Sequence, residues 1–362
     1  MCQNQAAAQA TVLLLCFCYN LLSVFSGVVL LVLQVAAPES QEVTVSVRPP
    51  GSNIYLGECV MLLCAVESNS TSVKNYLWFR SQKHSAPNPR HLVSRDSYYI
   101  TAVTVEDADK YWCQAECRGN RSVYVVEARP VTLTVSDLSP PTLSLTPNAR
   151  HMLGGERFTL QCPTSQTDSS SWKLMHFLPG NSTGTTVVSA HHLTPGGGVP
   201  AKNSDVLMFI AAGRNSGLYW CEGPAGRSNA VYITVSYGTI ILKTPAFPVV
   251  EGETVSLYCQ YQRGSHTKTS FFKNGEEIKK ITTATSGRVT TMVIRNVTRD
   301  DEGFYRCASQ DGKMQSSGSW LSVRPDRGNF TSLEEPPTSS SENAVRDSVL
   351  YRGVLKAGCV LK

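Results

Sequence analysis

The sequence DEGFYRC at residues 301–307 decides the fold, because it places a tyrosine two residues before a cysteine after a short polar turn. The same arrangement occurs as DADKYWC at 107–113 and as NSGLYWC at 215–221. The copies recur with a period of about 90–100 residues, which is close to the size of one small domain. The chain of 362 residues therefore contains three copies of one structural unit.

Each copy begins with a Gly-Glu turn and an alternating run that ends at a further cysteine. These runs are GECVMLLC at 57–64, GERFTLQC at 155–162 and GETVSLYC at 252–259. Successive side chains of a strand point to opposite faces, so every second residue of each run shares one buried face. A last alternating strand follows at 131–135, 231–235 and 320–323. The pattern predicts an all-β chain of repeated sandwiches.

These motifs resemble the immunoglobulin fold three times over, across about residues 40–325. An aromatic residue stands where the central strand of each sandwich is expected, at Trp78, Trp172 and Phe271. The resemblance predicts domains at 40–137, 138–236 and 237–325, followed by a disordered polar tail at 326–362. It also implies one disulfide per sandwich, and these are Cys64–Cys113, Cys162–Cys221 and Cys259–Cys307.

The N-terminal stretch at 12–37 contains no charged residue and is long enough to span a bilayer. Small residues at 35–37 fit a cleavage site, so we predict a signal peptide over 1–37, with an uncleaved anchor as the alternative. Either reading exports the rest of the chain to an oxidising compartment, where disulfides persist. The expected location is extracellular, either secreted or on the external side of the plasma membrane, and only this segment would contact the membrane.

Three of the 12 cysteines precede residue 37, which leaves nine, an odd number. Six of the nine belong to the implied bridges, and Cys59, Cys117 and Cys359 remain. Alternation turns Cys59 away from the sandwich core, and Cys117 is expected in the turn after its strand. These two thiols should lie near opposite ends of the sandwich, so we predict that they are not paired with each other. A disulfide-linked dimer is one expected state.

Five Asn-x-Ser/Thr sequences are candidate glycosylation sites, since an exported chain meets the glycosylation machinery. They are Asn69, Asn120, Asn181, Asn296 and Asn329.

Composition and motifs exclude several classes of function. The net charge of +5 is scattered, and no basic block indicates a nucleic-acid partner. The sequence contains no phosphate-binding glycine loop and no His-Glu-x-x-His motif. We therefore predict no enzyme activity, no catalytic residue, no cofactor and no metal site. Tandem sandwiches usually present loops to a protein partner.

The third repeat narrows the family further. The stretches TIILKTP at 239–245, FFKNGE at 271–276 and SWLSV at 319–323 resemble the membrane-proximal domain of leukocyte Fc receptors and Fc receptor-like proteins, including those of fishes. The resemblance implies a receptor that binds immunoglobulin Fc or another leukocyte surface protein, in immune response and cell surface receptor signalling. The alternative is an immunoglobulin-superfamily cell-adhesion protein.

In that family two tryptophans of the membrane-proximal domain clamp a proline of the antibody. The matching positions of this chain are Thr239 and Gln262, so both tryptophans are absent. Thr and Gln cannot supply the buried aromatic area, which weakens the specific expectation of antibody binding. The linker, the B–C loop and the F–G loop remain the expected contact region, with candidate residues Tyr237, Thr239, Tyr261, Gln262, Asp311 and Lys313.

Overall fold

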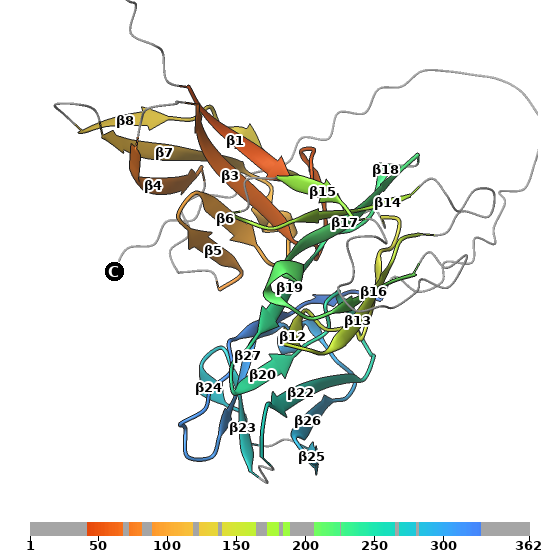
Figure 1. Cartoon of the computed structure of the whole chain (residues 1–362). Helices are drawn as coiled ribbons and strands as arrows, with labels where there is room; N and C mark the ends of the chain where they lie inside the picture. The colour runs from red at the N-terminus through yellow and green to blue at the C-terminus, as the bar shows by residue number, and fades with distance from the viewer. Residues whose placement is uncertain are drawn as a thin grey trace, which may run out of the picture.

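Three two-layered β-sandwiches follow one another along the chain (Figure 1). The computed structural model describes residues 42–67, 72–81, 89–118, 123–136, 140–163, 172–180, 184–188, 206–224, 226–264, 268–279 and 282–326. In these ranges the regular structure is strands and short 3-10 turns. The expected all-β class with tandem immunoglobulin-like sandwiches is confirmed.

The predicted leader at 1–37, most of the tail at 326–362 and Cys359 lie outside the described residues. Among the residues that are described, no helix is both long and apolar enough to cross a membrane.

The first sandwich pairs one sheet of order β1-β3-β6-β5 with another built on β4-β7-β8. Its core contains Leu62 and Tyr111, with the half-buried Trp78 packed against them. The strands are β1 (Glu42–Arg48), β2 (Asn53–Tyr55), β3 (Val60–Glu67), β4 (Ser72–Arg80), β5 (His91–Ser94), β6 (Ser97–Ile100), β7 (Lys110–Arg118), β8 (Val123–Glu127), β9 (Val131–Thr132) and β10 (Thr134–Ser136).

The second sandwich has a sheet of order β11-β13-β16 and a second of order β12-β19-β17-β14-β15, with β18 paired to β17. Phe158 and Phe209 stack in its core, with ring centroids 4.9 Å apart. The strands are β11 (Ser144–Thr146), β12 (His151–Leu153), β13 (Arg157–Gln161), β14 (Lys173–Phe177), β15 (Thr185–Val187), β16 (Val206–Ile210), β17 (Gly217–Gly223), β18 (Gly226–Arg227) and β19 (Val231–Ser236).

The third sandwich pairs a sheet of order β20-β22-β26-β25 with one of order β24-β23-β27-β28. Phe271 is fully buried in its core, where the other repeats carry tryptophan. The strands are β20 (Ile240–Lys243), β21 (Val249–Val250), β22 (Val255–Tyr261), β23 (Thr269–Lys273), β24 (Glu276–Glu277), β25 (Thr282–Ser286), β26 (Val289–Ile294), β27 (Gly303–Ser309), β28 (Ser319–Leu321) and β29 (Val323–Arg324).

The Tyr-x-Cys motif closes the same corner in each repeat. The tyrosine hydroxyl donates a hydrogen bond to the carbonyl four residues earlier, in or beside a 3-10 turn. These bonds tie the turn to the strand that follows it. They join Tyr111 to Asp107 at 3.0 Å near η1 (Val105–Asp107), Tyr219 to Asn215 at 2.9 Å near η3 (Gly213–Asn215), and Tyr305 to Asp301 at 2.7 Å near η4 (Arg299–Asp301).

A disulfide joins the two sheets of each sandwich. The bonded pairs are Cys64–Cys113, Cys162–Cys221 and Cys259–Cys307. Because each bridge closes a loop of about 50–60 residues, a chain-entropy model assigns it roughly 4 kcal/mol of stability.

The Gly-Glu turn has the same backbone conformation and the same hydrogen bond in each repeat. Its glycine has positive φ, +76° at Gly57, +88° at Gly155 and +89° at Gly252, which side chains with a Cβ rarely adopt. The following glutamate accepts a hydrogen bond from the backbone N–H three residues earlier. These bonds join Tyr55 to Glu58 at 2.6 Å, Leu153 to Glu156 at 2.8 Å, and Val250 to Glu253 at 3.1 Å.

The first sandwich buries both faces of β3, which alternation alone does not predict. Val60, Leu62 and Cys64 point into their own core, as expected. Met61 is also fully buried, because it packs with Trp220 of β17 in an apolar cluster between the first two sandwiches. This interface covers a sheet face that a single domain would expose to water.

Candidate ligand-binding surface

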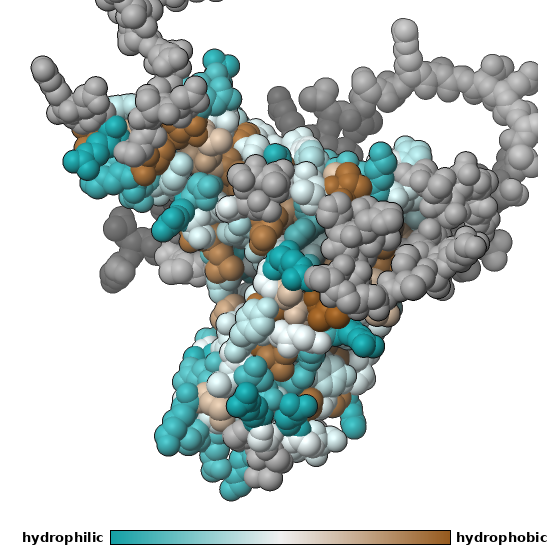
Figure 2. Space-filling view, viewed as in Figure 1, coloured by the Kyte–Doolittle hydropathy of each residue, from teal (hydrophilic) through white to brown (hydrophobic). Residues whose placement is uncertain are grey.

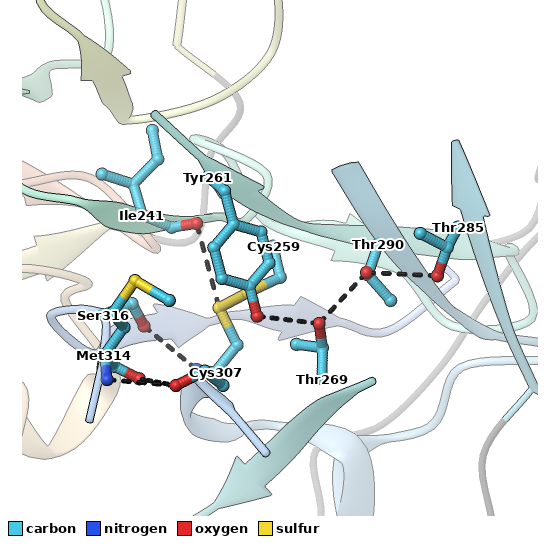
Figure 3. Close-up of a disulfide and its surroundings, with 10 residues drawn as sticks. Ile241, Cys259, Tyr261, Thr269, Thr285, Thr290, Cys307, Met314 and Ser316 are labelled. Atoms are coloured by element: carbon cyan, nitrogen blue, oxygen red, sulfur yellow. Dashed lines mark hydrogen bonds between the residues drawn. A yellow bond between two sulfur atoms is a disulfide. The ribbon is translucent and has the colours of Figure 1, made fainter. Parts of the chain in front are cut away.

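The linker and two loops of the third sandwich meet at one end of that domain. Ile240 of β20 pairs with Tyr261 at the end of β22, and the Tyr261 hydroxyl lies 2.9 Å from Oγ1 of Thr269. Thr269 in turn pairs with Ser309, the last residue of β27. Figure 3 shows this end of the domain around the Cys259–Cys307 bridge. The register therefore places the linker beside the ends of β22 and β27.

The linker presents Tyr237 and Thr239 to solvent. Tyr237 is 64% exposed, and its hydroxyl accepts a hydrogen bond from the Gly213 backbone N–H at 3.1 Å. Its ring lies against Gly154, where a Cβ would be only 2.3 Å from the ring edge. The Thr239 carbonyl accepts from the Gln262 N–H at 2.8 Å, so those two positions adjoin each other. The described linker residues therefore form an exposed but ordered strip.

The turn at 309–313 is polar and held by its own aspartate. Asp311 Oδ1 accepts hydrogen bonds from the Ser309 hydroxyl at 2.6 Å and from the Lys313 N–H at 3.2 Å. The Ser309 bond is the main reason that the pKa of Asp311 lies below its usual value. Lys313 is exposed, with its Nζ 3.8 Å from Asp311 Oδ2. The turn thus presents both signs of charge in a defined shape.

One predicted contact residue is placed elsewhere. Tyr261 is only 1% exposed and packs in the core of the third sandwich, so the expectation that it contacts a ligand directly is wrong. Side chains of a strand alternate between its two faces, so Tyr261 lies on the same inward face of β22 as Cys259, two residues earlier. The Tyr261 hydroxyl forms a hydrogen bond with Thr269. Gln262, the next residue, is exposed.

Of the five glycosylation candidates, Asn296 lies among the described residues, where it is exposed with φ of +53°. The candidates Asn69, Asn120, Asn181 and Asn329 lie outside them.

Cys59 and Cys117 are unbonded and buried. Cys59 lies in the apolar cluster between the first two sandwiches, on the outward side of its own sheet as alternation predicted. Cys117 is not in a turn as expected, because β7 runs to Arg118 and carries this thiol into the domain core. The two thiols therefore occupy separate apolar environments.

Two inter-domain clamps were missed by reasoning from the sequence. Glu156 of the second Gly-Glu turn accepts from Lys243 Nζ at 2.9 Å and from Gln260 Nε2 at 2.7 Å, both in the third sandwich. The carboxylate of Glu58 in the first turn accepts hydrogen bonds from both terminal nitrogens of Arg227 in the second sandwich. Nothing local in the sequence indicates these partners, because they lie 87 to 169 positions away.

Comparisons with known proteins agree with this architecture. The immunoglobulin domain family model matches residues 239–310. Human Fc receptor-like protein 5 is 26% identical over 60% of the chain, and human Fc receptor-like protein 3 is 23% identical over 75%. The chain is therefore similar to Fc receptor-like proteins and contains an immunoglobulin domain. Human Roundabout homolog 3 is also similar, at 26% identity over 81% of the chain and 21% of its own length.

The chain spans only part of the length of these relatives. It covers 22% of Fc receptor-like protein 5 and 36% of Fc receptor-like protein 3. The similarity therefore concerns their immunoglobulin domains.

Proposed function

We propose that this chain is the extracellular part of a non-catalytic immune receptor that binds a protein ligand through the linker-side end of its third sandwich. The ligand class is immunoglobulin or another leukocyte surface protein. The observation that carries the proposal is the convergence of Thr239, Gln262 and the 309–313 turn at one end of the third sandwich, with Tyr237 two residues before Thr239 and packed against the second sandwich. The similarity to Fc receptor-like proteins supports it.

The chemistry of this end favours a polar contact over an aromatic clamp. Thr239 and Gln262 are exposed and adjacent, and neither can bury a proline between rings. Tyr237 supplies the large exposed aromatic side chain, while Asp311 and Lys313 supply charge. On the face shown in Figure 2 the third sandwich, at the lower end, is mostly hydrophilic. A ligand of complementary polarity fits this surface better than an apolar one.

Export is part of the proposal, because three disulfides need an oxidising compartment. Domain boundaries at 40–137, 138–236 and 237–325 are proposed with it. Buried Cys59 and Cys117 are not available for a bond between chains, so a disulfide-linked dimer would use a cysteine outside the described residues, such as Cys359.

The test uses the exported full chain with a purification tag, immobilised at one density for every variant. Immunoglobulin Fc and a panel of leukocyte surface proteins are passed over it. We expect at least one saturable binder, weakened by about tenfold or more in Tyr237→Ala and Lys313→Glu. Arg324→Glu, an exposed change on β29, is the matched control and should not alter binding. A folded chain that binds none of the panel would count against the proposal, as would a ligand insensitive to both site variants.

The second candidate function is cell adhesion, which the similarity to Roundabout homolog 3 favours. It predicts self-association of the exported chain. Analytical ultracentrifugation at increasing concentration separates the two candidates, because a chain that stays monomeric would exclude adhesion through self-association.

A further inference from the structure

A cavity of about 260 Å³ lies where the three sandwiches meet. The first sandwich contributes Leu92 and Ile100, the second contributes Arg150, and the third contributes Phe304 and Trp320. This volume is far more than one water molecule needs and approaches the smaller cavities that hold organic ligands. The cavity belongs to none of the loops discussed above.

Arg150 brings an uncompensated positive charge to this cavity. Its side chain is 6% exposed and donates to the Thr101 carbonyl and to the Ala246 carbonyl, both at 3.0 Å. Both acceptors are neutral, and no carboxylate of the described residues lies within 4.0 Å of it. Among the residues that the structure describes, Arg90 is the other arginine buried to this degree, and it has Asp107 at 2.6 Å. A buried guanidinium without an anion is costly, so the site lacks a counter-charge.

Three nitrogens of residues that line the cavity have no hydrogen-bond partner among the described residues. They are Nε of Arg150, Nε1 of Trp320 and Nδ1 of His151. The first two are obligatory donors, since neither can accept a hydrogen bond. Native proteins leave few buried donors unpaired, so each of these calls for an acceptor.

The remaining walls are largely apolar. Leu92, Ile100 and Met61 line the cavity from the first sandwich, with Tyr99 and Tyr232 beside them. The rings of these two tyrosines meet edge to face, with centroids 5.7 Å apart. Such walls favour an organic body over a simple inorganic ion, because burying apolar area provides most of the binding energy.

We propose that this three-domain cavity binds a small organic monocarboxylate. Its carboxylate lies beside the Arg150 guanidinium and neutralises it, while its aliphatic or aromatic body packs on Leu92 and Phe304. Because the cavity is lined by all three sandwiches, the bound acid stabilises their arrangement.

Isothermal titration calorimetry of the exported full chain tests this with octanoate and 3-phenylpropionate. Their neutral analogues 1-octanol and 3-phenylpropanol keep the apolar body and lack the charge. We expect one acid bound per chain and binding of the matching alcohol weaker by about tenfold or more. Arg150→Gln should weaken the acid by about tenfold or more, while Arg295→Gln, an exposed arginine of the third sandwich, should leave it unchanged.

Two further variants keep the test informative if Arg150→Gln disturbs the domain arrangement. Arg150→Lys retains the charge and should retain part of the affinity, whereas Trp320→Ala removes an aromatic wall of the cavity and should weaken the acid about threefold or more. The proposal is overturned if the folded chain shows no saturation up to about 10 mM acid. It is also overturned if acid and alcohol bind equally, or if all the cavity variants bind like the unmodified chain.

Discussion

Glu58 and Arg227 form a two-pronged ion pair across the boundary between the first and second sandwiches, with oxygen–nitrogen distances of 2.7 and 2.8 Å. Glu58 is 3% exposed and also accepts from the backbone N–H groups of Tyr55 and Ala230. The carboxylate that closes a turn within one domain thus also binds the next domain. Local folding and domain arrangement are coupled through this side chain.

Replacing Arg227 should therefore lower the free energy of unfolding of the first two sandwiches. Arg227→Gln leaves Glu58 buried without a counter-charge, and we expect a loss of about 3 kcal/mol in the stability of the first two sandwiches. Urea unfolding followed by tryptophan fluorescence measures this. Arg263→Gln, an exposed arginine of the third sandwich, is the control. A loss below about 0.5 kcal/mol would show that the pair carries no net stability.

The three turn glutamates form a graded series. Glu58→Gln should destabilise most, because its carboxylate binds Arg227 while buried. Glu156→Gln should destabilise less, because its clamp to Lys243 is partly exposed. Glu253→Gln should destabilise least, since its described hydrogen bond is to the Val250 N–H. Equal losses in all three, measured by urea unfolding, would mean that turn closure dominates and the clamps contribute little.

Removing one oxygen atom should weaken the corner that the Tyr-x-Cys motif closes in the third sandwich. Tyr305→Phe removes the hydroxyl that donates to the Asp301 carbonyl, and we expect a loss of about 1 kcal/mol. Tyr258→Phe changes a tyrosine that is 42% exposed and should cost less than about 0.5 kcal/mol. Thermal unfolding of the two variants compares them directly. If both losses are the same, the corner bond makes no special contribution.

Stability should depend on His151 between neutral and acid pH. Burial, reinforced by the Arg150 charge, lowers the pKa of His151 to about 4. In the unfolded chain histidine takes up its proton near pH 6.5, so acidification favours the unfolded state first. His151 should therefore contribute a loss of about 3 kcal/mol as the pH falls from 6.5 to 4.

Urea unfolding at several pH values checks this against His151→Gln, which should lose less stability over the same interval. Burial also lowers the pKa of His176, so the pH dependence of stability is not due to His151 alone. The test is therefore the difference in stability loss between the unmodified chain and His151→Gln. Parallel pH profiles would refute a role for His151.

Cys59 and Cys117 should behave as protected thiols. Burial raises the pKa of both, so little reactive thiolate forms near neutral pH. We expect iodoacetamide to label them only after denaturation, which peptide mapping by mass spectrometry detects. Rapid labelling of the native chain would contradict the burial of these thiols, and a Cys59–Cys117 linked peptide would contradict their unbonded state.

The sequence by itself determined the repeated sandwich. Period two in β3 and β22 identified the inward residues, such as Leu62 and Leu257, because side chains of a strand alternate between faces whatever surrounds the domain. The family resemblance named the candidate residues of the linker-side surface, whose contact with a ligand stays a prediction, and all but one of them are exposed. Tyr261 was the exception. The family resemblance identified its place in the loop region, but strand alternation turns its side chain into the core.

Only the tertiary structure decided what covers the outward faces. Met61 and Trp220 stand on the solvent side of their own sheets, and they are buried because two domains pack face to face. Arg150 likewise reaches carbonyls of both neighbouring sandwiches. Alternation reports which face a residue takes, but whether that face meets water depends on the placement of a different domain, through contacts across long separations in the chain.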